Sequence, residues 1–268
     1  MRLKIKNWEL VGEIARGRWS TVYSARPLTG LCRNTDYVIK FVDPDSAGFD
    51  VAVEMLRREF ACSRLISDAG IISFLDHDLD AEMPFLVSGK MDGDSLLRIN
   101  KKLRCFVDFN EKVMFFRQLC QSLSSLHSLD IRHGDLSPGN ILIDLENGLT
   151  KIIDLGLAVK VTPFTRNDQW QAGTFGYQAP ECNALQEPVT VAADIFSLGK
   201  LMIEFFEGEK PMVIASSLPE ESPRRSLLAL LGRMTETNPL KRPTLSEVRL
   251  GLSELEIQSL EWSGRRAA

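Results

Sequence analysis

The sequence lacks any long apolar run and has no excess of positive charge. No stretch of about 18 consecutive apolar residues occurs in the 268-residue chain, so we expect no membrane-spanning helix. The first residues, M-R-L-K-I-K-N-W, hold no apolar segment long enough for a signal peptide. The net charge of −4 gives no indication of a nucleic-acid partner, and we expect none.

Cysteine is scarce and scattered. The five cysteines are odd in number, and no two of them have C-x-x-C spacing. This pattern argues against a zinc site or a disulfide framework and predicts reduced, mostly buried thiols, as in a cytoplasmic protein. The five are Cys32, Cys62, Cys105, Cys120 and Cys182.

One stretch carries most of the chemical information: H-G-D-L-S-P-G-N at residues 133–140, followed by D-L-G at residues 154–156. A carboxylate such as Asp135 can take the proton of an attacking hydroxyl. Asn140 and Asp154 can hold Mg²⁺, which prefers a few protein oxygens plus phosphate oxygens and water. Either motif alone also fits a simple turn. Both motifs in this order favour phosphoryl transfer from a metal-bound nucleotide.

Hydrophobic patterns predict a β-rich segment first and a mostly helical segment after residue 93. Asp50 is expected to cap the first helix, and Thr244 with Glu247 forms a capping box for the last one. The predicted strands are 8–15, 20–26, 37–42, 71–75, 85–88, 141–143 and 152–153, and the predicted helices are 50–67, 111–129, 191–206 and 244–257.

Further motifs lie on both sides of this stretch. They are I-A-R-G-R-W-S-T-V (14–22), V-I-K (38–40), R-R-E-F (57–60), L-V-S-G-K-M-D-G-D-S-L (86–96), G-T-F-G-Y-Q-A-P-E (173–181), D-I-F-S-L-G (194–199) and N-P-L-K-R-P-T (238–244). In this order the motifs resemble a eukaryotic-type (Hanks-type) Ser/Thr protein kinase domain, in a variant without the usual arginine before Asp135. The resemblance covers about residues 8–257.

The resemblance implies an α+β, two-lobed protein kinase-like fold in a single domain over residues 1–268, with the active site in the cleft. The small N-lobe would be β-rich with one main helix, and the larger C-lobe mainly α-helical. The helix near Glu209 to Met212 would be shortened. The implied boundaries are 1–88 for the N-lobe, 89–93 for the hinge, 94–257 for the C-lobe and 258–268 for a tail.

The resemblance also implies ATP and Mg²⁺ as cofactors and a protein as substrate. Lys40 would contact the α- and β-phosphates and pair with Glu59, with Glu54 as the weaker alternative. The implied catalytic set is Asp135, Lys40, Glu59, Asn140, Asp154 and Thr174, of which Asn140 and Asp154 are the metal ligands. The implied nucleotide-binding residues are Ile14, Gly17, Val22, Val38, Lys40, Ser88 (the gatekeeper), Gly89, Met91, Leu142 and Asp154.

Three other positions distinguish protein kinases from small-molecule kinases. By the resemblance, Asp194 would anchor the backbone of the catalytic loop, and Arg242 would form a buried ion pair with Glu181. Small-molecule phosphotransferases of the aminoglycoside or choline kinase type share H-G-D-x-x-P-x-N but lack these features. The three residues therefore argue against that alternative.

The chain also departs from the family pattern. Ala15 and Ser20 replace the outer glycines of the nucleotide-covering loop, and Ser137 replaces a lysine that usually contacts the γ-phosphate. Gly134 replaces the arginine that normally docks a phosphorylated activation loop. These departures leave a non-catalytic, nucleotide-gated binding module (a pseudokinase) as an alternative. The presence of Asp135 and the metal-binding positions favours an active enzyme.

Overall fold

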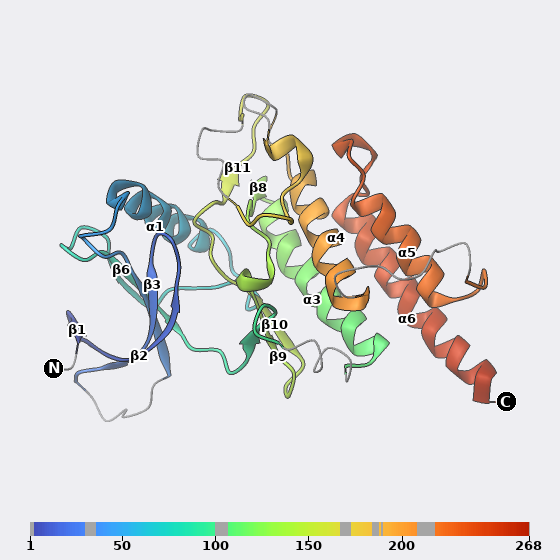
Figure 1. The fold of residues 1–268 in the computed structure, drawn as a ribbon, viewed down its shortest axis with the longest axis horizontal. Helices are drawn as coiled ribbons and strands as arrows, with labels where there is room; N and C mark the ends of the chain where they lie inside the picture. Colours follow the sequence, from blue (N-terminus) through green and yellow to red (C-terminus); the bar gives the residue numbers. More distant parts are fainter. Residues whose placement is uncertain are drawn as a thin grey trace. The chain divides into compact units, whose positions relative to one another are not determined.

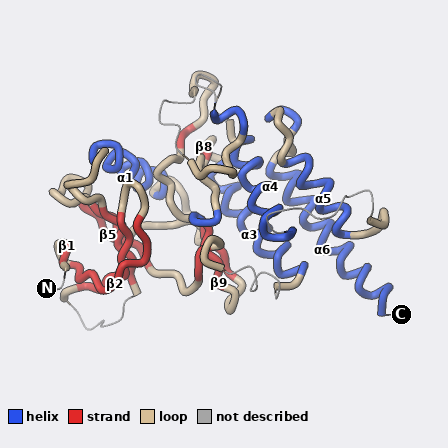
Figure 2. The backbone as a smooth tube through the Cα atoms, viewed as in Figure 1, coloured by secondary structure: helices blue, strands red, loops and turns tan. Residues whose placement is uncertain are grey.

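The chain forms two compact units. A computed structural model describes residues 3–29, 36–99, 107–166, 173–183, 188, 190–207 and 218–267. The first unit comprises Met1–Ser67, Ile71–Asp92 and Asp154–Leu157, and the second comprises Asp68–Gly70, Gly93–Ile153 and Ala158–Ala268. The first is built on a β-sheet and the second mainly on helices (Figures 1 and 2). The predicted α+β class is confirmed.

The first unit contains a six-stranded antiparallel sheet in the order β1-β2-β3-β4-β6-β5. Buried apolar side chains lie on both faces of the sheet: Phe85 and Val87 belong to one cluster, and Leu86 between them belongs to another. The strands are β1 (Lys4–Ile5), β2 (Trp8–Arg16), β3 (Thr21–Pro27), β4 (Tyr37–Phe41), β5 (Asp76–Asp78) and β6 (Phe85–Gly89). The sequence prediction agrees for β2, β3, β4 and β6.

The predicted strand at residues 71–75 is wrong. The edge strand β5 instead starts at Asp76, and its residues are polar. Ile71 is buried and Phe74 packs into the apolar cluster beside helix α1, so the apolar side chains that suggested a strand serve packing. Asp76 accepts a hydrogen bond from Trp8 Nε1 at 2.7 Å, which ties this edge to the start of β2.

Helix α1 (Phe49–Ser63) is the main helix of the first unit and packs beside the sheet (Figure 1). Its N-cap is Gly48, in the left-handed conformation at φ 86°, and no side chain caps the helix. The prediction that Asp50 is the cap is therefore wrong; Asp50 lies in the first turn. The helix also ends at Ser63 rather than Ser67, because the next amides, those of Leu65 and Ile66, donate to carbonyls three residues back instead of four.

Over its described residues the second unit is formed around four helices: α3 (Phe109–His127), α4 (Ala192–Glu207), α5 (Pro223–Met234) and α6 (Leu245–Ala267). Figure 1 shows α3, α4, α5 and α6 packed together, in agreement with their contacts. The predicted apolar stripe of α3 is confirmed. Its members Val113, Phe116, Cys120, Leu123 and Leu126 are all buried.

Capping boxes begin two of these helices. At α6 the Thr244 amide donates to Glu247 at 2.7 Å and the Glu247 amide donates to Thr244 Oγ1 at 3.3 Å, as predicted. The helix runs to Ala267, ten residues past the predicted end at residue 257. At α3 an equivalent box between Asp108 and Glu111 starts the helix earlier than predicted.

Short strands connect the helices of the second unit. They are β7 (Asp94–Ser95), β8 (Ile131–Arg132), β9 (Ile141–Asp144), β10 (Leu149–Ile152) and β11 (Val159–Lys160), in sheets β10-β9-β7 and β11-β8. The buried strands predicted at residues 141–143 and 152–153 correspond to β9 and the end of β10. The shortened helix predicted near residues 209–212 lies outside the described residues.

The described cysteines are all free thiols. Cys120 is buried in α3, and burial raises the pKa of its thiol to about 12, so it remains protonated and unreactive. Cys62 and Cys182 are only partly buried, so the expectation of mostly buried thiols holds for one of the three. Among the described helices, none has the length and apolar character needed to cross a membrane.

Candidate active site

Asp135 is held by a hydrogen-bonded set within the second unit. The short 3₁₀ helix η1 (Pro138–Asn140) places Asn140 beside it, and Asn140 Nδ2 donates to both Asp135 Oδ2 and the Asp135 carbonyl, each at 2.9 Å. The amide and hydroxyl of Thr174 both donate to Asp135 Oδ1 at 2.8 Å. Three members of the implied catalytic set, Asp135, Asn140 and Thr174, are therefore in contact. The carboxylate is oriented by three donors that come from two separate segments.

The backbone of the same loop is fixed from below by Asp194, near the start of α4. Asp194 is 1% exposed, and its two oxygens accept from the amides of His133 at 2.8 Å and Gly134 at 3.0 Å. His127 Nε2 lies 2.9 Å from the same carboxylate. Burial alone would raise the pKa of Asp194, but the hydrogen bonds from His127 and the loop outweigh it and hold the pKa below its usual value. The predicted anchoring role of Asp194 is confirmed.

Gly134 lies at the position where the family usually has arginine. Its φ is 84°, in the left-handed region that glycine adopts without strain. The amide of Gly134 points to Asp194 in this conformation. The glycine thus allows the loop to turn while its backbone remains hydrogen-bonded, and it leaves no cation at this position.

Lys40 and Glu59 form the predicted ion pair in the first unit. Lys40 Nζ lies 2.6 Å from Glu59 Oε2 and 2.9 Å from Asp154 Oδ1, so one ammonium joins two carboxylates. Burial alone would lower the pKa of Lys40, but Asp154 and Glu59 outweigh it and raise the pKa above its usual value. Burial raises the pKa of Glu59 to about 7, although the ammonium of Lys40 opposes this shift.

Asp154 has an unusual backbone conformation, with φ at 64° in a residue other than glycine. Such a backbone conformation costs on the order of 1–3 kcal/mol, and conformations of this kind cluster at functional sites. Its Oδ1 accepts from the Gly156 amide at 3.2 Å, and its side chain is 42% exposed. Carboxylate oxygens that remain accessible suit a hard divalent cation.

Each unit supplies an oxygen that suits Mg²⁺. Asp154 supplies an accessible carboxylate. Asn140 uses Nδ2 on Asp135, which leaves Oδ1 as the oxygen for a cation. Mg²⁺ is typically held by one or two protein oxygens together with phosphates and water. The described residues contain no group of three or more His, Cys, Asp or Glu side chains that could hold a metal ion.

The strand register places the predicted adenine-site residues of the first unit. Ser88 is opposite Val38 in the β4–β6 pair, and Val22 is opposite Lys40 in the β3–β4 pair. Ser88 is 6% exposed, whereas Gly89 next to it is exposed. Ile14, Gly17 and Met91 also belong to this unit, and Leu142 lies in β9 of the second unit.

The loop between β2 and β3 does not depend on glycine geometry. None of residues 15–20 has positive φ, and the Gly17 amide donates to the Ser20 carbonyl at 2.9 Å to close the turn. Ala15 and Ser20 therefore replace the usual glycines without backbone strain.

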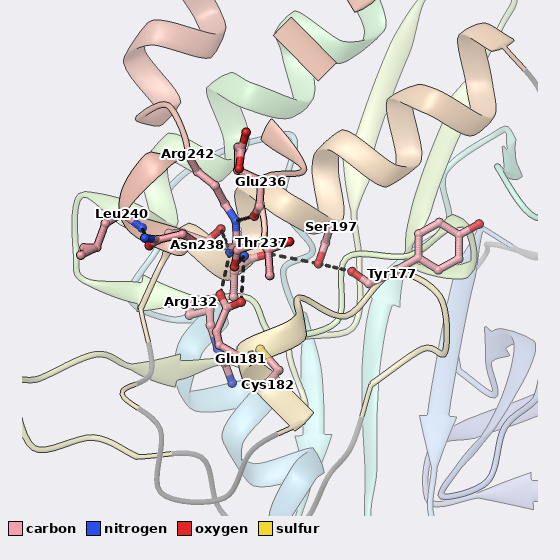
Figure 3. A network of polar contacts seen from close by, with 12 residues as sticks. Arg132, Tyr177, Glu181, Cys182, Ser197, Glu236, Thr237, Asn238, Leu240 and Arg242 are labelled. Carbon is pink, nitrogen blue, oxygen red and sulfur yellow. Dashed lines mark hydrogen bonds and ion pairs between the residues drawn. The ribbon is translucent and has the colours of Figure 1, made fainter. Parts of the chain in front are cut away.

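The predicted buried pair of Glu181 and Arg242 lies in the second unit, and Figure 3 shows it from close by. Arg242 Nη1 and Nη2 contact the two oxygens of Glu181 at 2.6 and 2.8 Å in a bidentate arrangement. The guanidinium also donates to backbone carbonyls of Ala192, Glu236 and Thr237. Its donors are thus extensively satisfied, which a buried charge requires.

Three contacts around this pair have no signal in the sequence. Arg132 Nη1 lies 3.4 Å from Cys182 Sγ, Tyr177 donates its hydroxyl to Glu204, and Ser197 Oγ donates to the Tyr177 carbonyl at 2.8 Å. Figure 3 shows Arg132 beside Cys182 and Ser197 beside Tyr177. The partners are 20 to 50 residues apart. Only the folded arrangement brings them together.

Comparison with known proteins identifies the family that shares these features. The model of the protein kinase domain family matches residues 8–250. A probable serine/threonine-protein kinase of Dictyostelium discoideum is 27% identical over 223 residues, which cover 78% of this chain and 24% of the relative. The serine/threonine-protein kinase PknA of Corynebacterium glutamicum is 30% identical over 228 residues, covering 78% of this chain and 46% of the relative.

Not every relative is described as active. An inactive serine/threonine-protein kinase of Mus musculus, PLK5, is 27% identical over 247 residues, which cover 88% of this chain and 40% of the relative. The chain spans less than half the length of each of these three relatives. The similarity therefore concerns only part of each relative. Whether this chain catalyses transfer or only binds a nucleotide has to be argued from the polar residues of the site.

Proposed function

Because the chain belongs to the protein kinase domain family, we propose that it transfers the γ-phosphate of Mg·ATP to serine or threonine hydroxyls of protein substrates. One observation carries this proposal: the carboxylate of Asp135 is held at once by Asn140 and Thr174. A carboxylate oriented in this way is positioned to act as a base, and a threonine at position 174 is typical of kinases that phosphorylate serine or threonine rather than tyrosine.

The two units supply complementary parts of the proposed reaction. Asp154 and Asn140 Oδ1 would hold Mg²⁺, which supplies neutralisation of phosphate charge. Lys40, held by Glu59, would orient the α- and β-phosphates. The substrate hydroxyl would donate a hydrogen bond to Asp135; its oxygen forms the new bond to the γ-phosphorus, the bond to the ADP oxygen breaks, and the proton passes to Asp135. Positioning and charge neutralisation provide most of the catalysis.

Adenine would lie against apolar side chains and a short piece of backbone. Val22, Val38 and Leu142 are proposed to sandwich the base, and backbone groups of Gly89 and Met91 to hydrogen-bond its edge. Ser88 would be the gatekeeper, and Ile14 and Gly17 would cover the nucleotide. The register of Ser88 opposite Val38 supports this assignment, because it places the two residues side by side on neighbouring strands.

Two departures from the family pattern bear on the rate of transfer and on its dependence on phosphorylation. Ser137 is 3% exposed and supplies no charge where the family usually has lysine, so we expect weaker stabilisation of the transition state. Gly134 leaves no cation at its position, so we propose that activity does not require a phosphate docked there. These same departures favour the second candidate, a nucleotide-binding module without catalysis, as one relative is described as inactive.

One experiment separates the candidates. Purified protein is incubated with γ-labelled ATP, Mg²⁺ and generic protein substrates, beside a panel of choline and aminoglycosides, with Asp135→Asn as the control. Label on serine or threonine of proteins, absent in the control, is the expected result. Label on a small molecule would select a small-molecule phosphotransferase. No transfer by a protein that still binds ATP would select the binding module.

A further inference from the structure

The loop between β2 and β3 carries a tryptophan at its tip that packs inward. Trp19 is partly buried and lies against an apolar cluster beneath helix α1. The guanidinium of Arg18 stacks on the ring at 4.4 Å from its centre. The buried members of the cluster are Val42, Ala52, Val53, Leu56 and Leu86, which come from α1, from β6 and from the end of β4.

Gly48, the N-cap of α1, lies against this ring and leaves no room for a side chain of its own. A Cβ added to Gly48 would lie 2.7 Å from Trp19 Cζ3, closer than two carbon atoms can approach. Gly48 is therefore fixed as glycine for two reasons, its φ of 86° and the ring that covers its Cα. The loop and the N-cap residue of the helix are therefore in direct contact.

Helix α1 also carries Glu59, the partner of Lys40. Ala52, Val53 and Leu56 hold the helix on the same cluster that receives Trp19. Because protein interiors are close-packed, a shift of the ring is transmitted to the helix through these contacts. One apolar cluster therefore joins the nucleotide-covering loop to the ion pair that orients the phosphate-binding lysine.

We propose that Trp19 is a positioning residue that holds the nucleotide-covering loop against the start of α1. It takes over the role of the missing glycines: the loop is placed by a side-chain anchor instead of by glycine backbone geometry. The loop and the Lys40–Glu59 pair then form one preorganised nucleotide-binding surface. This inference rests on the proposed function and adds a residue and a contact to it.

The test compares three variants in the full chain. Trp19→Ala removes the anchor, Trp19→Phe keeps a smaller aromatic ring, and Phe74→Ala is the matched control, because Phe74 packs on the same cluster without belonging to the loop. Affinity for the Mg²⁺ complex of a non-hydrolysable ATP analogue is measured by calorimetry, and amide hydrogen exchange is measured over residues 15–21. These two readouts do not need phosphoryl transfer.

For Trp19→Ala we expect affinity for the analogue to fall by about tenfold, because a loop that is no longer preorganised must be ordered on binding. Amide hydrogen exchange over residues 15–21 should rise. Trp19→Phe should have affinity and loop exchange closer to those of the wild type than to those of Trp19→Ala. In the active enzyme, KM for ATP should rise more than kcat falls. Phe74→Ala should lower the melting temperature while leaving affinity and loop exchange near those of the wild type.

The contact itself is tested by a double-mutant cycle with Gly48→Ala. Gly48→Ala alone should weaken analogue binding because its Cβ displaces the ring, and it should have a smaller effect in the Trp19→Ala background, where the ring is absent. Equal effects in both backgrounds would overturn the proposed contact. Unchanged affinity and loop exchange in Trp19→Ala, or the same losses in Phe74→Ala, would overturn the positioning role. Absence of phosphoryl transfer in the wild type would instead count against the proposed function alone.

Discussion

At the scale of single residues, the carboxylates of Asp135 and Asp154 are already oriented by hydrogen bonds and ion pairs. Asp135 accepts three side-chain or amide hydrogen bonds from Asn140 and Thr174, and Asp154 accepts from Lys40 and from the Gly156 amide. Such bonds fix orientation at little cost when the reaction occurs, since no reorganisation is needed. Removing the carboxylates should therefore affect chemistry more than folding.

Asp135→Asn and Asp154→Ala should both abolish transfer, with kcat lower by at least about 100-fold, because one removes the base and the other the metal ligand. Asp154→Ala should also weaken Mg-dependent binding of ATP, and Asp135→Asn should not. Single-turnover transfer and ATP titration with and without Mg²⁺ provide the measurements. Turnover that survives in either variant would refute the assignment of these residues, provided that circular dichroism shows an intact fold.

Lys40→Met should lower kcat/KM by on the order of 100-fold or more, since it removes the cation proposed to orient the phosphates. The variant should still fold. Burial already holds the pKa of Glu59 at about 7, so without Lys40 this carboxyl can take a proton near neutral pH and avoid an unpaired buried charge. Glu59→Gln should cost less, about tenfold or below, because an amide oxygen can still accept from the ammonium. Steady-state kinetics that show equal losses, or none for Lys40→Met, would contradict the pairing role.

Ser88→Met should confer resistance to ATP-competitive inhibitors with bulky aromatic groups. Ser88 is small, buried and opposite Val38, so space beside adenine is proposed to remain open in the wild type. A methionine side chain would fill the space that the inhibitor group needs, while ATP does not enter it. Inhibition constants are compared between the two proteins, after confirming that both bind ATP. The same inhibitor affinity in both would show that Ser88 is not the gatekeeper and that the hinge register is displaced.

At the scale of elements, features set by residues within one turn could be predicted from the sequence. Features that depend on contacts between distant residues could not. The start of α6 could be predicted because Thr244 and Glu247 satisfy each other within one turn. The end of α1 could not, because the residues at which the hydrogen bonds change to the i−3 pattern, Leu65 and Ile66, carry no glycine or proline to signal it. The edge strand at Asp76 has no apolar alternation, so its pairing with β6 leaves no pattern in the sequence.

The same distinction applies to the site. The Lys40–Glu59 and Glu181–Arg242 pairs were predicted because known motifs carry them, and their distances agree with the prediction. The contact of Trp19 with Gly48 was not predicted, since it depends on the packing of a loop tip against a helix start. Contacts of that kind are decided by the folded surface and not by spacing along the chain.

The segment after β11 contains two threonines, Thr162 and Thr165, whose substitution tests whether activity depends on phosphorylation. The hydroxyls of Thr162 and Thr165 lie 2.7 Å apart and hold a local turn, with Thr165 also donating to the Lys160 carbonyl at 3.3 Å. Because Gly134 supplies no cation, Thr162→Ala and Thr165→Ala should each keep activity within about twofold. Kinase assays of both variants check this. A large loss that an acidic substitution restores would show that another cation, such as Arg132 or Arg166, docks a phosphate.

At the scale of the whole molecule, each unit incorporates a piece of chain from the other part of the sequence. Residues 154–157 belong to the first unit, where Asp154 contacts Lys40 and the Leu155 amide donates to Glu59. Residues 68–70 belong to the second, where Asp68 accepts from Ser122 at 3.2 Å and Ser125 at 2.6 Å. The two halves of the proposed site are thus each completed within their own unit by local polar contacts.

The stability of the second unit should depend strongly on the Glu181–Arg242 pair. Glu181→Ala should lower the free energy of unfolding by about 3–5 kcal/mol, because it leaves a buried guanidinium without its counter-charge. The side chain of Arg242 is 0% exposed, so solvent cannot replace the lost carboxylate. Glu220→Ala is the matched control in the same unit: its pair with Arg225 is long, at 3.8 Å, and Glu220 is 89% exposed, so the expected cost is below about 1 kcal/mol. Urea unfolding followed by the helical circular dichroism signal, which reports mainly on this unit, gives both values. Equal costs for the two variants would mean that the three backbone carbonyls around Arg242 are sufficient to stabilise its charge.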